Sequence, residues 1–231
     1  MRSYRQPYNQ EKIFLEKEAD AWFDRNSASI VEPAPPDHRV LQALRNLDLP
    51  LEGTMLDIGG AAGQVSAGFL REYPAWSCCV VEPSSRAISA GNVAFPNLEF
   101  AQGSIAQPEG MPWTEVDIVI VSGVFCWVDR LLLSRAVANV DRALKDGGLL
   151  VISDFDSPVL RANSYSHHQG LFTYKQDYAE IFRALGNYHL LYRKSENLES
   201  HSSSDISDLY DCQWATTVLR KDSQGRYYKS P

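Results

Sequence analysis

The residues with the clearest capacity for chemistry begin with a turn of small side chains. Residues 56–64 read LDIGGAAGQ and directly follow an apolar run. Small residues let a backbone come into contact with a pyrophosphate, a nucleoside or another cofactor. The dinucleotide fingerprint GxGxxG, started at Gly59, would need glycine at Ala61 and Gln64, and the GK[ST] ending of a Walker A loop is missing too. The turn therefore indicates a different cofactor, or a packing turn that binds nothing.

A carboxylate ends the next apolar run. The segment VVEP places Glu82 just before Pro83. An acid in this position can accept hydrogen bonds from both ribose hydroxyls of a nucleoside that lies across the strand ends. Taken alone, Glu82 is also compatible with an ordinary solvated acid. Together with the glycine turn, it favours a nucleoside site.

Two adjacent histidines lie in a polar and aromatic segment, residues 154–175. His167 and His168 are candidates for a general base, because histidine titrates near neutral pH. The competing interpretation is a pair of ordinary surface residues, and the sequence does not decide between the two histidines either. Tyr165 and Tyr174 flank the pair, and hydroxyl-bearing rings suit a pocket for a polar, partly planar or sugar-like ligand.

An alternation of short apolar runs and amphipathic segments must position these groups. Strands are expected at 54–58, 77–81, 98–101, 118–121 and 149–152, and helices at 64–73, 85–95 and 131–144. Strands buried on both faces and separated by helices indicate an α/β fold with a doubly wound, mostly parallel sheet. Ligands of such sheets bind outside the carboxyl ends of the strands, so the site is expected in the residues that follow each apolar run.

Two flanking regions complete a single domain, residues 1–231. Residues 1–50 predict an N-terminal helical cap, with Asp37 as the N-cap of its second helix. Residues 53–155 form the cofactor-binding core. Residues 156–231 supply a substrate-side loop, one helix and the last two strands. These C-terminal elements are expected at 176–185, 188–192 and 214–219.

Five motifs in order, between Gly53 and Asp154, resemble those of class I S-adenosylmethionine-dependent methyltransferases. LDIGGAAG resembles their first motif, Glu82 matches the acid of the second strand, and Gly103-Ser104 matches the turn on the adenine side. DIVIVSGVFCWV resembles the fourth strand with its trailing turn, and RALKDGGLLVI the following helix and turn.

The resemblance implies S-adenosyl-L-methionine as the cofactor. It also implies a seven-stranded, mostly parallel sheet with an antiparallel C-terminal strand and helices on both faces. The implied cofactor-binding residues are Asp57, Gly59, Gly60, Ala61, Gly63, Glu82, Pro83, Ser104, Ile105 and Ser122.

Two positions depart from the family pattern. Ser104 stands where an aspartate is frequent, although a hydroxyl can still bond the adenine amino group. Cys126-Trp127 occupies the place of a polar pair such as His-His. Phe125 and Trp127 thus form an aromatic wall that either lines a substrate pocket or packs within the fold.

Composition removes several classes of partner. The net charge of −7 and the absence of an Asn/Asp-Pro-Pro-aromatic motif speak against nucleic acid. No apolar stretch approaches 18 residues, so no membrane partner is expected. Four cysteines without a CxxC pair favour free thiols and a cytoplasmic protein, and no metal site is expected.

The remaining partner is a small polar metabolite or a saccharide precursor. The leading hypothesis is O-methylation with His167 or His168 as the base. N-methylation of a small amine is the alternative, which needs no strong base but a neutral amine held near carboxylates and aromatic rings. A non-catalytic module that only binds the cofactor is a third hypothesis.

Overall fold

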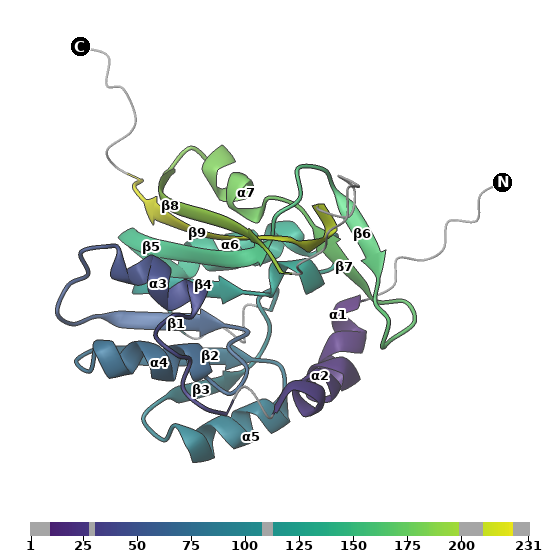
Figure 1. Ribbon diagram of the computed structural model, residues 1–231, viewed down its shortest axis with the longest axis horizontal. Helices are drawn as coiled ribbons and strands as arrows, with labels where there is room; N and C mark the ends of the chain where they lie inside the picture. The colour runs from purple at the N-terminus through teal and green to yellow at the C-terminus, as the bar shows by residue number, and fades with distance from the viewer. Residues whose placement is uncertain (1–9, 28–30, 108–112, 199–209, 224–231) are drawn as a thin grey trace, which may run out of the picture.

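The computed structural model describes residues 10–27, 31–107, 113–198 and 210–223 (Figure 1). A seven-stranded sheet in the order β3-β2-β1-β4-β5-β9-β8 forms the central layer. Its strands are β1 (Thr54–Ile58), β2 (Ser77–Glu82), β3 (Glu99–Gln102), β4 (Val116–Ser122), β5 (Leu144–Phe155), β8 (Tyr188–Asn197) and β9 (Gln213–Lys221). Neighbours from β3 to β5 are parallel, and β9 is antiparallel to both β5 and β8. The predicted doubly wound α/β fold is confirmed.

Helices cover both faces of this sheet, because the central strands bury both of their faces. The helices are α3 (Arg39–Arg45), α4 (Gln64–Glu72), α5 (Ser85–Ala94), α6 (Leu133–Ala143) and α7 (Tyr178–Ala184). In β1, Met55 packs in the same core cluster as residues of α3 and α4, whereas Leu56 packs with α6 and α7. In β4, Ile118 and Val119 divide between the two clusters in the same way. The alternation places Asp57 on the α4 face of the sheet.

The first helix lies at the end of the sheet where β1, β2 and β4 have their carboxyl ends. It runs without a break through α1 (Gln10–Ile13), a π-helical segment (Phe14–Glu18) and α2 (Ala19–Asn26). This confirms the helix expected at the start of the cap. The predicted N-cap of α3 is wrong, because His38 and not Asp37 precedes its first residue. The His38 N–H is bonded to the carbonyl of Pro35, so Asp37 lies inside a turn, one residue too early.

The polar segment after β5 is a hairpin and not a loop. Strands β6 (Arg161–Ser164) and β7 (Phe172–Lys175) form a separate two-stranded antiparallel sheet. The strands are short and half exposed, so their sequence lacks the apolar alternation that marks a strand of the main sheet. Figure 1 shows the hairpin beyond the end of the sheet, near α1.

Candidate functional site

A pocket lies where the carboxyl ends of β1, β2 and β4 meet the first helix. Its lining combines apolar side chains with a few carboxylates, as is typical of small-molecule sites. Its floor is made by the turns that follow β1, β2, β3 and β4; we call these turns the floor. The helix of residues 10–26 covers the pocket, and the β6–β7 hairpin is bonded to this helix outside the pocket lining; we call these two elements the roof.

The glycine turn serves both the pocket and the packing of the fold. Gly59 lines the pocket, and with φ +70° it adopts a conformation that favours glycine. A Cβ at Gly60 would lie 2.7 Å from Asp57 Oδ2, and a Cβ at Gly63 would lie 2.6 Å from Leu98 Cδ1. Gly60 and Gly63 are therefore required by protein packing and do not line the pocket.

Ala61 lines the same turn in a strained conformation. Its φ is +49°, in the left-handed region that L-residues other than glycine rarely occupy. Its N–H donates to Glu82 Oε2 at 3.0 Å. The strained backbone thus directs an amide at the acid of β2 and joins the first two turns of the floor.

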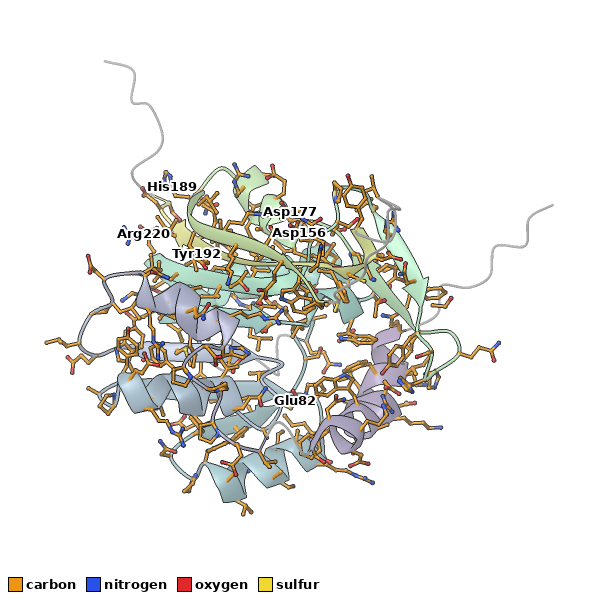
Figure 2. The ribbon with its side chains drawn as sticks, viewed as in Figure 1. Glu82, Asp156, Asp177, His189, Tyr192 and Arg220 are labelled. Carbon is orange, nitrogen blue, oxygen red and sulfur yellow. The ribbon has the colours of Figure 1, made fainter. Side chains whose placement is uncertain are left out.

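Glu82 is a buried carboxylate at the edge of the pocket. It is 7% exposed, lines the pocket, and accepts hydrogen bonds from the N–H groups of Ala61 and Ser84 (3.0 and 2.9 Å). Burial raises the pKa of Glu82 to about 7. Figure 2 shows it between the end of β2 and the first helix. Each carboxylate oxygen retains a second lone pair, so Glu82 can still accept hydrogen bonds from a ligand.

Asp57 has a structural position. It is 1% exposed, accepts a hydrogen bond from Ser66 Oγ at 3.0 Å, and does not line the pocket. Burial raises its pKa to about 7. The bond to Ser66 connects β1 to α4. Because the glycine turn joins these two elements, Asp57 stabilises the conformation of the turn.

The turn after β3 contributes one polar and several apolar groups. Ser104 and Ile105 line the pocket, and Ser104 Oγ donates to Glu11 Oε1 of the roof at 2.6 Å. The Ile105 carbonyl accepts from Asn139 Nδ2 at 3.0 Å, which fixes this turn against α6. The sequence-predicted cofactor residues that line the pocket are Gly59, Ala61, Glu82, Pro83, Ser104, Ile105 and Ser122.

The aromatic wall divides between pocket and core. Trp127 lines the pocket, and its ring lies 5.7 Å from Phe14 and 4.7 Å from Tyr165. Phe125 is fully buried and stacks on Tyr178 at 5.3 Å, so it faces the core. Both belong to one 3-10 turn, in which residues two apart point in different directions.

The remaining sequence-predicted substrate residues lie around the pocket. Tyr165 contacts Trp127, and its hydroxyl accepts from Arg25 at 2.8 Å, but it does not line the pocket. Tyr174 packs under the guanidinium of Arg130, 4.2 Å from the ring centre, and does not line it either.

Both candidate histidines lie at the hairpin turn and outside the pocket lining. His167 is exposed, and its ring lies 5.2 Å from that of Tyr165. His168 Nδ1 lies 2.9 Å from the carbonyl of Gln169. The structure therefore does not bring either histidine to the floor.

The roof supplies lining residues that the sequence reasoning missed. Glu11, Phe14 and Trp22 of the first helix line the pocket. On the floor, the sequence reasoning also missed Asp129, which follows β4. Glu11 lies four residues before Leu15, on the side of the helix that also carries Ala19 and Trp22, so helical spacing could have found it. Asp129 had no comparable signal.

The side chain of Gln10 connects the first helix to the hairpin through hydrogen bonds. It is 2% exposed, and its Nε2 donates to the carbonyls of Trp127 and Phe172 (2.7 and 2.8 Å). Its Oε1 accepts from the Phe172 N–H at 3.0 Å. One side chain thus joins the helix, the turn after β4 and the hairpin.

The described parts of the chain contain no group of three or more His, Cys, Asp or Glu side chains arranged to hold a metal ion. Asp156 and Asp177 lie close together (Figure 2). Arg193 forms an ion pair with each of them, at 2.6 and 3.0 Å. No helix among the described residues is both long and apolar enough to span a bilayer.

The chain belongs to the methyltransferase-domain family, whose model matches residues 19–195. With the seven-stranded sheet and the pocket at its strand ends, it is a class I S-adenosylmethionine-dependent methyltransferase, and S-adenosyl-L-methionine is its cofactor. No curated protein matches the chain.

Solved structures share the fold at low sequence identity. The 1,6-didemethyltoxoflavin-N1-methyltransferase of Burkholderia thailandensis, bound to 1,6-didemethyltoxoflavin and S-adenosylhomocysteine, has a TM-score of 0.68 and 12% identity over 95% of this chain and 92% of that one. An S-adenosylmethionine-dependent methyltransferase from Mesorhizobium loti has a TM-score of 0.57 and 13% identity, over 81% and 100%. A TehB-like methyltransferase from Corynebacterium glutamicum has a TM-score of 0.55 and 16% identity, over 91% and 100%.

The lining residues fit this cofactor chemically. Glu82 offers a carboxylate for a ribose diol, and Ser104 and Glu11 offer polar atoms next to the apolar side chain of Ile105. The acids that line the pocket also suit a ligand that carries a positive sulfonium.

Proposed function

We propose that the protein methylates a small polar acceptor that carries no negative charge, and that the acceptor atom is a nitrogen. The observation that carries the proposal is the character of the pocket lining. Glu11 and Glu82 lie on the side that we assign to the nucleoside of the cofactor, so the remaining ionisable side chain among the described lining residues is Asp129, two residues from Trp127. A carboxylate near an aromatic ring favours an amine or a nitrogen heterocycle over a phosphorylated or carboxylated molecule.

The chain's part in the reaction is alignment and exclusion of water. The bound cofactor supplies an electrophilic methyl group on a sulfonium, so an attacking amine needs no strong base. Asp129 is 8% exposed, and its two oxygens accept from the N–H groups of Gln10 and Leu131 (3.2 and 3.0 Å). These bonds hold its charge at the pocket wall, where it stabilises the positive charge that develops on an attacking nitrogen.

The neighbour from Burkholderia thailandensis is named as a 1,6-didemethyltoxoflavin-N1-methyltransferase, so a protein of this fold can carry the activity that we propose. In our proposal residues 53–155 supply most of the cofactor site, residues 1–50 form a helical cap over it, and residues 156–231 complete the same domain on the acceptor side.

O-methylation of a metabolite or saccharide precursor is the second candidate. His167 at the hairpin turn contacts Tyr165, and Tyr165 contacts Trp127, which lines the pocket. These ring contacts connect the hairpin turn to the pocket wall. A histidine base would require the turn to move toward the pocket, because neither histidine lines it.

A panel of acceptors in matched sets tests the proposal. The set pairs amines with the corresponding alcohols and carboxylates, and methyl transfer is measured for the wild type, His167→Ala and His168→Ala. We expect turnover of amines and full activity in both variants. Turnover of alcohols that falls at least tenfold in one variant would establish the O-methylation candidate instead. Cofactor binding without turnover of any acceptor would favour a non-catalytic module.

A further inference from the structure

The carboxylate of Glu11 reaches the pocket from the roof, at the turn after β3. It is half-buried, and one oxygen accepts the Ser104 hydroxyl at 2.6 Å. Within the described chain, Glu11 forms no ion pair and its second oxygen has no hydrogen-bond partner. The second oxygen of this half-buried carboxylate can therefore accept a hydrogen bond from a ligand in the pocket.

The order of the strands indicates which part of the cofactor reaches Glu11. Glu82 ends β2 and is suited to the ribose, while Gly59 follows β1 on one side of it. The turn after β3 lies on the other side, and Gly103 N–H is bonded to the Glu82 carbonyl at 3.1 Å. A nucleoside anchored at Glu82, with its amino-acid part at the β1 turn, therefore directs its base toward Ser104 and Ile105.

We propose that Glu11 accepts a hydrogen bond from the exocyclic amino group of adenine, and so makes a residue of the first helix part of cofactor selection. The adenine amino group donates and does not accept, and Glu11 is a pure acceptor. Ser104 orients the carboxylate, because its hydroxyl proton is committed to Glu11. The acid at this end of the pocket thus comes from the roof and not from the turn after β3.

Glu11 also links the cofactor to the packing of the first helix. It follows Gln10, whose side chain bonds the helix to the turn after β4 and to the hairpin. A ligand that bonds Glu11 therefore stabilises the packed helix by mass action. The inference concerns the cofactor alone and does not depend on which acceptor is methylated.

The test compares binding of S-adenosylhomocysteine with two base-modified analogues by calorimetry. In one analogue hydrogen replaces the adenine amino group, and in the other an oxo group replaces it. Glu11→Ala removes the acceptor, and Glu11→Gln adds a donor at the same place. Glu16→Gln, on an exposed residue of the same helix that pairs with Lys12, is the control.

We expect Glu11→Ala to weaken S-adenosylhomocysteine binding about 10- to 100-fold and to leave binding of the deamino analogue within about threefold. Glu11→Gln should bind the oxo analogue more tightly than the wild type does, which a merely structural role would not produce. Thermal unfolding of each variant establishes that it is folded. Equal weakening of all three ligands by Glu11→Ala, or no weakening of any, would overturn the proposal.

Discussion

The floor and the roof enclose one pocket but are held in place by different kinds of interaction. The floor depends on backbone: strand register fixes β1 beside β2, and two backbone amides bind the Glu82 carboxylate. The roof depends on a few side chains, chiefly Gln10 and the contact between Arg25 and Tyr165. A site fixed by backbone suits an invariant cofactor, whereas a site fixed by side chains can be varied to suit an acceptor.

The largest effect is expected from removing the acid of the floor. Glu82→Ala deletes the carboxylate that we propose to bind the ribose, and it leaves the amides of Ala61 and Ser84 without this partner. We expect affinity for S-adenosylhomocysteine to fall at least about 100-fold in calorimetry. Glu99→Ala, an exposed acid in β3, is the control. If the affinity of the variant stayed within threefold of that of the wild type, the floor would have no part in cofactor binding.

The second effect is a pH dependence of stability within the floor. Burial raises the pKa of Asp57 from 3.8 to about 7. The folded state therefore binds a proton more tightly than the unfolded state. Its stabilising contribution is complete below about pH 4 and is lost as the pH rises to about 7, by roughly 1.4 kcal/mol for each pH unit.

Denaturant unfolding between pH 4 and pH 8 measures this dependence. In Asp57→Asn we expect a flatter profile and a smaller difference between pH 5 and pH 7, with the remaining dependence due to Glu82, whose pKa burial also raises. An unchanged profile in the variant would show that Asp57 does not carry the effect.

A smaller effect is expected in the roof. Gln10→Ala removes three hydrogen bonds and should lower the free energy of unfolding by about 1–3 kcal/mol. Because the floor remains intact, affinity for S-adenosylhomocysteine should fall by only about tenfold or less. A loss as large as that of Glu82→Ala would contradict the division between floor and roof.

The smallest effect is expected at the strained residue of the floor. Ala61→Gly relieves the positive φ and should raise the free energy of unfolding by about 1 kcal/mol. Ala62→Gly is the matched control, since Ala62 is fully buried without a positive φ and its loss of a methyl group should destabilise the fold. Destabilisation by Ala61→Gly would show that the turn is not strained.

The same division explains how much could be predicted from sequence. The floor is encoded locally: an apolar strand followed by small residues, and a second strand that ends in Glu82, are visible in short windows. The seven-stranded, mostly parallel sheet and its antiparallel C-terminal strand followed from the resemblance of these motifs, whereas the order of the strands comes from the structure. Even here, the sequence did not show why Gly60 must be small. The reason is the side chain of Asp57, which occupies the space that a Cβ at Gly60 would need.

The roof could not be predicted to the same depth, because its residues act through tertiary contacts. In the sequence, Glu11 resembles an exposed acid on a helix. Its role becomes visible only in the structure, where Ser104 of a distant turn bonds it. Phe125 and Trp127 are similar side chains two residues apart, and the 3-10 turn decides which of them reaches the pocket. The hairpin that carries His167 has too little apolar pattern to be recognised as a strand pair.

The most direct test of the account is a crystal structure of the protein with S-adenosylhomocysteine. We predict that both ribose hydroxyls bond the carboxylate of Glu82 and that the adenine lies at Ser104, with its amino group on Glu11. A ligand that leaves Glu82 without contact, or that places its base away from the turn after β3, would contradict the account.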